Sequence, residues 1–142
     1  MTTADDKALR IARAMFAAEG SGPAWGIELI DVRIDYARIA MRLTPAMMNA
    51  HRTVHGGMTF ALADSALAYA SNARNVRAVV SHASMVFLTP AYEGERLIAE
   101  AHLRLREGRS SIFAISITAE DGRAVGEFQG HTRDVGGYIL DE

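Results

Sequence analysis

The 142-residue sequence contains no cysteine, no long hydrophobic run and no marked excess of either charge. Without cysteine the chain forms no disulfide, offers no thiolate nucleophile and lacks a cysteine-based metal site. Its apolar runs fall short of the ~18 residues needed to span a bilayer. A formal net charge of -2 gives no reason to expect nucleic acid or a membrane as a partner.

The N-terminal segment is charged where a secretory signal would be apolar. Asp5 and Asp6 precede the first apolar positions, and Arg10 and Arg13 interrupt them. A signal peptide has an uninterrupted apolar region, and a mitochondrial transit peptide is poor in acidic residues. We therefore expect a cytoplasmic protein.

Length and composition predict one domain over residues 1–142. Apolar residues recur at helical spacing near the start of the chain, which predicts an N-terminal helical extension within residues 1–22. Period-two alternation predicts a strand hairpin between Gly26 and Leu43 and four further strands after Arg74. We expect these four strands at residues 77–88, 95–106, 111–119 and 123–132.

The second of these four strands has a regular alternation of apolar and polar residues. The pattern predicts one apolar face that includes Leu97, Leu103 and Leu105 and one polar face that includes Arg104 and Arg106.

The segment between Arg52 and Arg74 contains one charged residue, Asp64. From Met58 to Ala70, ten of thirteen residues are apolar, and they surround the predicted helix instead of forming one stripe. Such a helix must be buried on most sides. The sequence therefore predicts an α+β fold in which about six antiparallel strands wrap around a long central helix, whose far side is covered by sheet or by another subunit.

A lone carboxylate in such a helix has three explanations. Asp64 could lie at an exposed helix face or make a structural hydrogen bond, because burying an unpaired carboxylate costs several kcal/mol in practice. Alternatively, it could be held in an apolar cleft as a nucleophile or general base, where burial raises its pKa.

His55, Gly56 and Gly57 stand where this helix should begin. The glycines leave backbone N–H groups uncovered at the positive end of the helix dipole, where they can polarise a carbonyl. Gly56 and Asp64 are eight residues apart, or roughly 12 Å along a helix axis, so one helix cannot easily bring both to one reacting centre. We therefore expect Asp64 of one subunit to face the Gly56 N–H of a symmetry-related subunit.

The stretch NAHRTVHGGMTFALADSALAYASN resembles the signature of the hotdog-fold acyl-CoA thioesterases, in particular their phenylacetate-pathway branch, called PaaI. The resemblance continues through Ser-Met-Val-Phe-Leu-Thr-Pro and the later strands, over about residues 25–134. It implies a hotdog fold, assembly as a homodimer or a homotetramer built as a dimer of dimers, and active sites at the subunit interface. It also implies hydrolysis of an aryl- or short- to medium-chain acyl-CoA to the free acid and CoA, without a metal or other cofactor.

The same resemblance implies roles for individual residues. Asp64 matches the catalytic carboxylate, acting as nucleophile or as base toward water, and Gly56 matches the glycine whose N–H binds the thioester carbonyl oxygen. Asn49 and His55 match the polar pair that orients the substrate and this N–H. Ser65 follows the aspartate and is expected to help place the carboxylate or water.

The remaining expected contacts rest on weaker correspondences. Ser81 matches a serine that relatives place on the following strand, although Ser84 competes for this role. The residues expected to contact the substrate are Gly57, Phe60, Leu67, Tyr69 and Arg109. Among these, Arg109 in the Arg-Glu-Gly-Arg-Ser-Ser turn is the first candidate for a coenzyme A phosphate contact, ahead of Arg77 and Arg133.

Each role has a structural alternative. Asn49 could cap a turn, and His55 could be a helix N-terminal residue with a satisfied hydrogen bond. The glycines could let helix and sheet pack closely, and Phe60, Leu67 and Tyr69 could be plain core. Alternative functions are an acyl-thioester dehydratase or hydratase of the same fold, and a non-catalytic acyl-CoA binder. A metal site built on His51, His55 and His82 is disfavoured because the HExxH pattern is absent.

Overall fold

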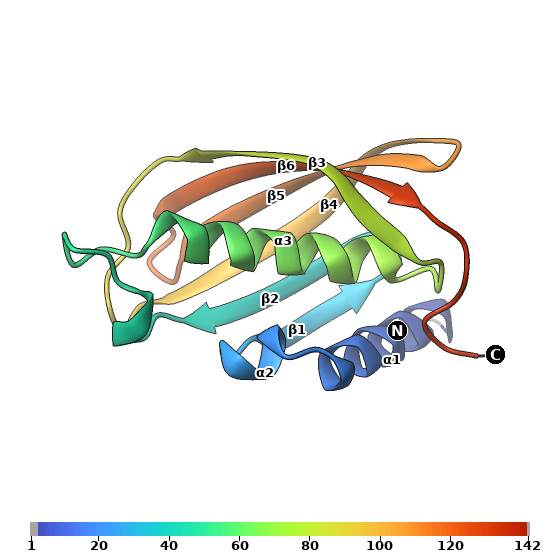
Figure 1. Ribbon diagram of the computed structural model, residues 1–142, viewed down its shortest axis with the longest axis horizontal. Coiled ribbons are helices and arrows are strands. Elements are labelled where there is room, and N and C mark those ends of the chain that lie inside the picture. Colours follow the sequence, from blue (N-terminus) through green and yellow to red (C-terminus); the bar gives the residue numbers. More distant parts are fainter. Residues whose placement is uncertain (1–2, 142) are drawn as a thin grey trace.

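The computed structural model describes residues 3–141 (Figure 1). Along the chain, helices precede and follow one strand hairpin, and four more strands come after them. The elements in chain order are α1 (Thr3–Ala18), α2 (Ser21–Ala24), β1 (Glu28–Arg33), β2 (Tyr36–Arg42), the 3₁₀ turn η1 (Pro45–Met47), α3 (Gly56–Asn72), β3 (Ala78–Phe87), β4 (Arg96–Glu107), β5 (Ser110–Ala119) and β6 (Ala124–Asp134). The predicted order of helices and strands is confirmed. The short turns α2 and η1 were not predicted. Residues 1, 2 and 142, which the predicted domain includes, lie outside the described residues.

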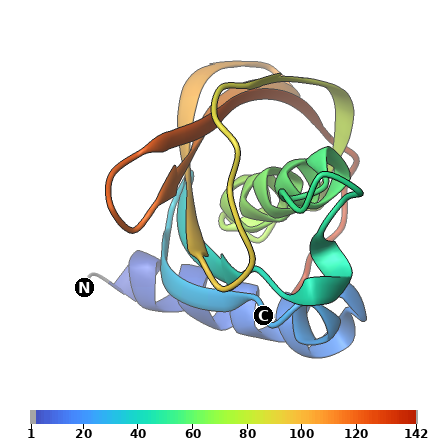
Figure 2. The same ribbon diagram turned by 90° about the vertical axis from the view of Figure 1, so that its left-hand side faces the viewer.

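The six strands form one antiparallel sheet in the order β1-β2-β4-β5-β6-β3. The sheet curves around α3, which lies along its concave side (Figure 2). This arrangement of a sheet wrapped around a central helix is the hotdog fold, as the sequence predicted. β1 and β3 are the two edge strands, so the outer edge of β3 has no strand beside it within residues 3–141.

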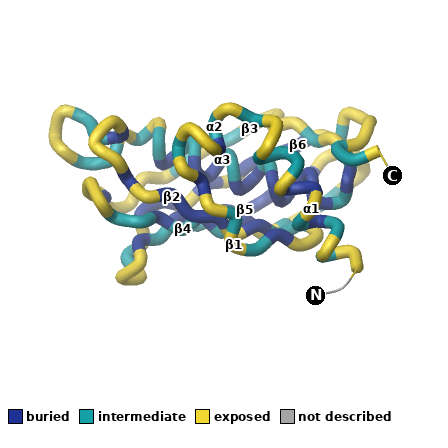
Figure 3. Tube along the Cα trace, turned by 90° about the horizontal axis from the view of Figure 1, so that it is seen from below, coloured by how far each residue is buried: buried dark blue, intermediate teal, exposed yellow. Residues whose placement is uncertain are grey.

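The core lies between α3 and the concave face of the sheet, and buried segments gather along the middle of the molecule (Figure 3). Leu62 and Leu67 of α3 are fully buried against apolar strand residues such as Ile39, Leu97 and Ile115. α3 contacts all six strands and α1. A helix that is apolar on most sides is therefore covered on most sides, which explains its composition.

The N-terminal helix α1 packs against β1, the edge strand of the first hairpin, and also contacts α3. Its buried residues are Ala8, Ile11 and Ala12. Asp5 and Asp6 lie in its first turn, where the positive end of the helix dipole stabilises carboxylates. The predicted N-terminal helical extension is confirmed. No helix within residues 3–141 is long and apolar enough to cross a membrane.

The alternation predicted for β4 ends at an irregularity in its pairing with β5. The register shifts between Leu103 and Leu105, because Arg104 is an extra residue on the β4 side. Leu105 therefore points outward and is 57% exposed, so the prediction that it shares a face with the buried Leu97 is wrong. Arg106 turns inward and makes two hydrogen bonds to Asp35, at 2.9 and 2.6 Å.

Candidate active site

The loop before α3 is held by one asparagine side chain. Asn49 Oδ1 accepts hydrogen bonds from the N–H groups of His51 and Thr53, at 2.9 and 3.2 Å, and from the Thr53 hydroxyl at 3.2 Å. Its Nδ2 donates to Thr53 Oγ1 at 3.0 Å. Arg52 in this loop has a φ of +63°, so the turn is tight. Asn49 thus fixes the path of the chain into α3, which agrees with its turn-capping alternative.

His55 caps the N-terminus of α3. Its Nδ1 accepts a hydrogen bond from the Gly57 N–H at 2.9 Å, and its carbonyl oxygen accepts from the Met58 N–H at 2.9 Å. The first N–H groups of a helix have no partner inside the helix, and these two bonds satisfy the N–H groups of its second and third residues, Gly57 and Met58. Because Nδ1 is an acceptor, the neutral ring carries its proton on Nε2.

The Gly56 N–H has no acceptor among residues 3–141. It is the first N–H of α3 and stands at the positive end of the helix dipole. A free N–H in this position can donate to a carbonyl oxygen or an oxyanion of a ligand. The sequence predicted an uncovered N–H at both glycines; this is the geometry of Gly56, whereas the prediction is wrong for Gly57, whose N–H is bonded to the His55 side chain.

Asp64 lies two turns further along α3 and is partly buried. Its carboxylate has no hydrogen-bond or ion-pair partner within the described part of the chain, and burial raises its pKa. The neighbouring Ser65 hydroxyl donates to the Ala61 carbonyl oxygen at 2.8 Å, so its proton is not directed at Asp64. A half-buried carboxylate without a partner is suited to take up a proton.

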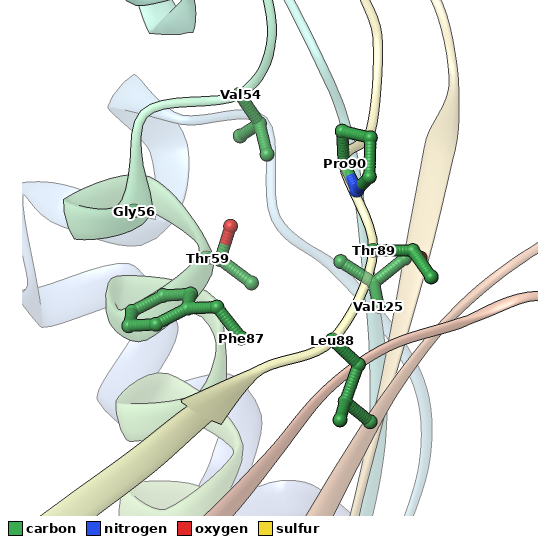
Figure 4. A pocket seen from close by; sticks show the side chains of 8 residues that line it. All are labelled: Val54, Gly56, Thr59, Phe87, Leu88, Thr89, Pro90 and Val125. Carbon is green, nitrogen blue, oxygen red and sulfur yellow. The ribbon is translucent and has the colours of Figure 1, made fainter.

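Beside the Gly56 N–H lies a cavity of about 350 Å³ between the start of α3 and the end of β3 (Figure 4). It is lined by Val54, Gly56, Thr59, Phe87, Leu88, Thr89, Pro90 and Val125. Of these residues the sequence predicted only Gly56. Asp64 does not line the cavity. Val54 and Thr59 are close to Gly56 in the sequence, whereas the remaining lining residues come from distant segments. Residues 87–90 among them belong to the strand end that carried the family resemblance.

Three of the expected substrate contacts belong to the core of this subunit. Leu67 is fully buried, Phe60 packs edge-on against Phe128 with ring centroids 5.0 Å apart, and Tyr69 donates its hydroxyl hydrogen bond to Glu19 of the segment after α1. None of the three lines the cavity. Within the subunit their positions agree with the core alternative.

The other predicted residues lie away from Gly56. Ser81 is exposed at an irregular position in β3 and donates to the His131 carbonyl oxygen at 3.2 Å, and Ser84 is exposed further along β3. Arg109 is exposed in the turn between β4 and β5, and its carbonyl oxygen accepts from the Asp134 N–H at 2.8 Å. Asp134 pairs with Arg74, just after the C-terminus of α3, so Arg109 lies at the far end of that helix.

The histidines of the disfavoured metal alternative do not form a cluster. The ring of His82 on β3 faces that of His131 on β6, with centroids 5.1 Å apart, while His51 belongs to the loop before α3. Among residues 3–141 there is no group of three side chains that could hold a metal ion.

The fold and the free N–H at the start of the central helix define a hotdog protein with a candidate thioester site, and sequence comparison gives its family. The sequence pattern of the thioesterase superfamily matches residues 51–125, just over half of the chain, so this chain belongs to the thioesterase superfamily. It is 35% identical to the acyl-coenzyme A thioesterase PaaI of Escherichia coli (strain K12) over 136 residues, which span 96% of this chain and 97% of the relative.

Two solved structures of PaaI proteins are similar to this chain in fold and in sequence. The E. coli PaaI protein from the phenylacetic acid degradation operon superposes with a TM-score of 0.94 at 33% identity, covering 96% of this chain and 99% of that one. A mutant of the phenylacetic acid degradation protein PaaI from Thermus thermophilus superposes with a TM-score of 0.77 at 30% identity, covering 80% of this chain and 97% of that one.

Proposed function

We propose that this protein is an acyl-CoA thioesterase, which hydrolyses an acyl-CoA thioester to the free acid and CoA. The observation that carries the proposal is the Gly56 N–H, which is free at the start of α3 and belongs to a residue that lines a cavity. The unpartnered carboxylate of Asp64 on the same helix supplies the second catalytic group. The identity to an acyl-coenzyme A thioesterase over nearly the whole chain supports the same activity.

In the proposed reaction the thioester carbonyl oxygen accepts a hydrogen bond from the Gly56 N–H. This donor and the helix dipole stabilise the negative charge that develops on the oxygen during attack. Asp64 acts either as a base, taking a proton from the attacking water, or as a nucleophile that forms an anhydride, which water then hydrolyses. In both routes the C–S bond breaks, the sulfur leaves as the CoA thiolate and takes up a proton, and the acyl group ends as a carboxylate.

The two catalytic groups of one subunit are too far apart for a single thioester. Eight residues of α-helix separate them by roughly 12 Å along the axis. We propose that the active site forms between two subunits, with Asp64 from one and Gly56 from the other, in a homodimer or a dimer of dimers. Two features support this assembly. The partly exposed face of α3 around Asp64 carries the small residues Ala61, Ser65 and Ala68, and β3 presents an open strand edge.

The proposed substrates are aryl-acyl thioesters similar to phenylacetyl-CoA, with short- and medium-chain acyl-CoAs as the alternative. The support is the similarity to two proteins of phenylacetic acid degradation.

The activity is tested by measuring thiol release from a panel of aryl- and aliphatic acyl-CoAs with wild type and Asp64→Asn. The absence of cysteine removes the protein's own thiol background. Turnover that collapses in Asp64→Asn supports hydrolysis and ranks the acyl groups. Binding without turnover would favour the non-catalytic binder, and hydration or dehydration of an enoyl- or hydroxyacyl-CoA would favour the hydratase alternative.

The shared active site is tested with two defective variants. Gly56→Pro removes the N–H at the first helical position, where proline is well tolerated, and His55 before it has the extended conformation that proline requires, with φ -64° and ψ 130°. Asp64→Asn removes the carboxylate. Each variant alone should be nearly inactive.

An equimolar mixture of these two variants, unfolded and refolded together, should recover about a quarter of wild-type activity, because half of the dimers are mixed and each mixed dimer has one intact site. Refolding each variant separately is the control. No recovery, with mixed dimers demonstrated by mass spectrometry, would mean that Asp64 and Gly56 of the same subunit act together.

A further inference from the structure

Thr59 has a buried hydroxyl without a hydrogen-bond partner. The residue is 1% exposed, and no partner for its Oγ1 exists among the described residues. Other hydroxyls of α3 behave differently: Ser65 and Ser71 donate to the carbonyl oxygens of Ala61 and Ala68, at 2.8 and 3.3 Å. A buried hydroxyl normally finds such a partner, so the free Thr59 hydroxyl requires an explanation.

The usual helical acceptor for Thr59 is already in use. A threonine hydroxyl in a helix commonly bonds to the carbonyl oxygen four residues earlier, which here belongs to His55. That oxygen already accepts from the N–H groups of Met58 and Thr59, at 2.9 and 3.4 Å. A carbonyl oxygen has two lone pairs, so the hydroxyl has no good acceptor behind it.

The Thr59 side chain lies between α3 and the end of β3, with its hydroxyl oxygen turned toward Val54 (Figure 4). Most side chains that line this cavity are apolar. The second threonine there, Thr89, donates its hydroxyl hydrogen bond to the Ala124 carbonyl oxygen at 2.7 Å. Among the side chains that line the cavity, Thr59 therefore carries the uncommitted hydrogen-bonding group.

We propose that the Thr59 hydroxyl is a positioning group that binds the amide of the substrate's thiol arm nearest to the sulfur. The proposal rests on the proposed thioesterase function. Thr59 follows Gly56 by three residues, so the two occupy the same helix face roughly 5–6 Å apart. In every CoA thioester this amide is separated from the sulfur by two methylene groups. A carbonyl held at Gly56 therefore places the amide within one helical turn, where Thr59 lies.

The test compares two thioesters of the same acyl group, one of N-acetylcysteamine, which has this amide, and one of ethanethiol, which lacks it. Thr59→Val removes the hydroxyl and keeps the shape of the side chain, and Thr59→Ser keeps the hydroxyl. The matched control Thr89→Val removes a hydroxyl that the protein already uses. Comparing two variants on two substrates isolates the contact between hydroxyl and amide from other effects of each change.

Thr59→Val should raise KM for the N-acetylcysteamine thioester by roughly three- to tenfold, the effect of losing one neutral hydrogen bond, and should leave the ethanethiol thioester unaffected. Thr59→Ser should restore the difference between the two substrates. Any loss of activity in Thr89→Val should be the same for both thioesters. Thr59→Val should melt at the same temperature as wild type or higher, because it removes a buried hydroxyl without a partner.

An equal effect of Thr59→Val on both thioesters, or a lower melting temperature without a kinetic effect, would show a structural role and overturn the proposal. If wild type hydrolyses no thioester, the proposed function fails separately. Calorimetric titration with CoA, which carries the same amide, then decides the inference: weaker binding by Thr59→Val supports it, and equal binding overturns it.

Discussion

The ring of Phe87 packs directly on Gly56, where its Cε1 atom lies 3.3 Å from the position that a Cβ of residue 56 would take. The end of β3 therefore covers the first residue of α3, beside its free N–H. Phe87 is exposed, so its ring can shift to admit a methyl group, but the wall beside the N–H then shifts as well.

Gly56→Ala should accordingly separate stability from activity. Alanine is a better helix former than glycine, so the free energy of unfolding should stay within about 1 kcal/mol of wild type or rise. kcat/KM should fall by at least about tenfold, because the displaced ring and the new methyl crowd the oxygen that accepts from this N–H. Denaturant unfolding measures the free energy of unfolding, and steady-state kinetics measure kcat/KM. Full activity would mean that the thioester does not approach Gly56.

Asp64 should lower stability at neutral pH. Burial raises its pKa above the ordinary value of 3.8, so the unfolded chain loses this proton at lower pH than the folded protein does. Stability then falls as the pH rises from the pKa of the unfolded chain to the higher pKa of the folded protein, and the loss persists at higher pH. Asp64→Asn should therefore melt at a higher temperature than wild type at pH 7, and the difference should shrink below pH 3.8.

Melting curves of wild type and Asp64→Asn across this pH range measure the effect. Glu127→Gln, which neutralises an exposed carboxylate on β6, is the control for a general charge effect. A lower melting temperature of Asp64→Asn at pH 7 would mean that a donor or cation across a subunit interface stabilises the ionised carboxylate.

The fold was predictable because its central element is unusual. A helix of 17 residues with a single charged side chain requires burial on most sides, and the six-stranded curved sheet supplies that cover. The residues that line the cavity were not predictable for the same reason. When a helix is apolar all round, periodicity does not tell which face meets a cavity: Thr59 lines it, whereas Phe60, Leu67 and Tyr69 do not.

The lining of the cavity also depends on distances that the sequence does not show. Phe87 and Thr59 are almost thirty residues apart and meet because β3 ends beside the start of α3. The positions of Gly56 and His55 at the helix start were easier to predict, because a helix start places its free N–H groups and its cap within a few consecutive residues.

The irregularity in β4 gives a direct test of the sheet register. Leu105 is 57% exposed and Leu97 is fully buried, although simple alternation places them on one face. Leu97→Ala should lower the free energy of unfolding by about 2–5 kcal/mol, whereas Leu105→Ala should change it by less than about 0.5 kcal/mol. Urea denaturation of both variants measures this. Equal costs would show that Leu105 is buried, against the core or against another subunit.

His55 should stabilise α3 through its Nδ1 atom, and the side chain can be replaced by another acceptor. His55→Ala removes the cap on the Gly57 N–H and should cost about 1 kcal/mol of unfolding free energy. His55→Asn should restore that loss, because asparagine is a preferred capping residue, and should recover most of the activity if the role of His55 is to hold the helix start in place. Denaturant unfolding and kcat/KM of the two variants decide the point. A stable but inactive His55→Asn would assign the Nε2–H of the ring a direct contact with the substrate.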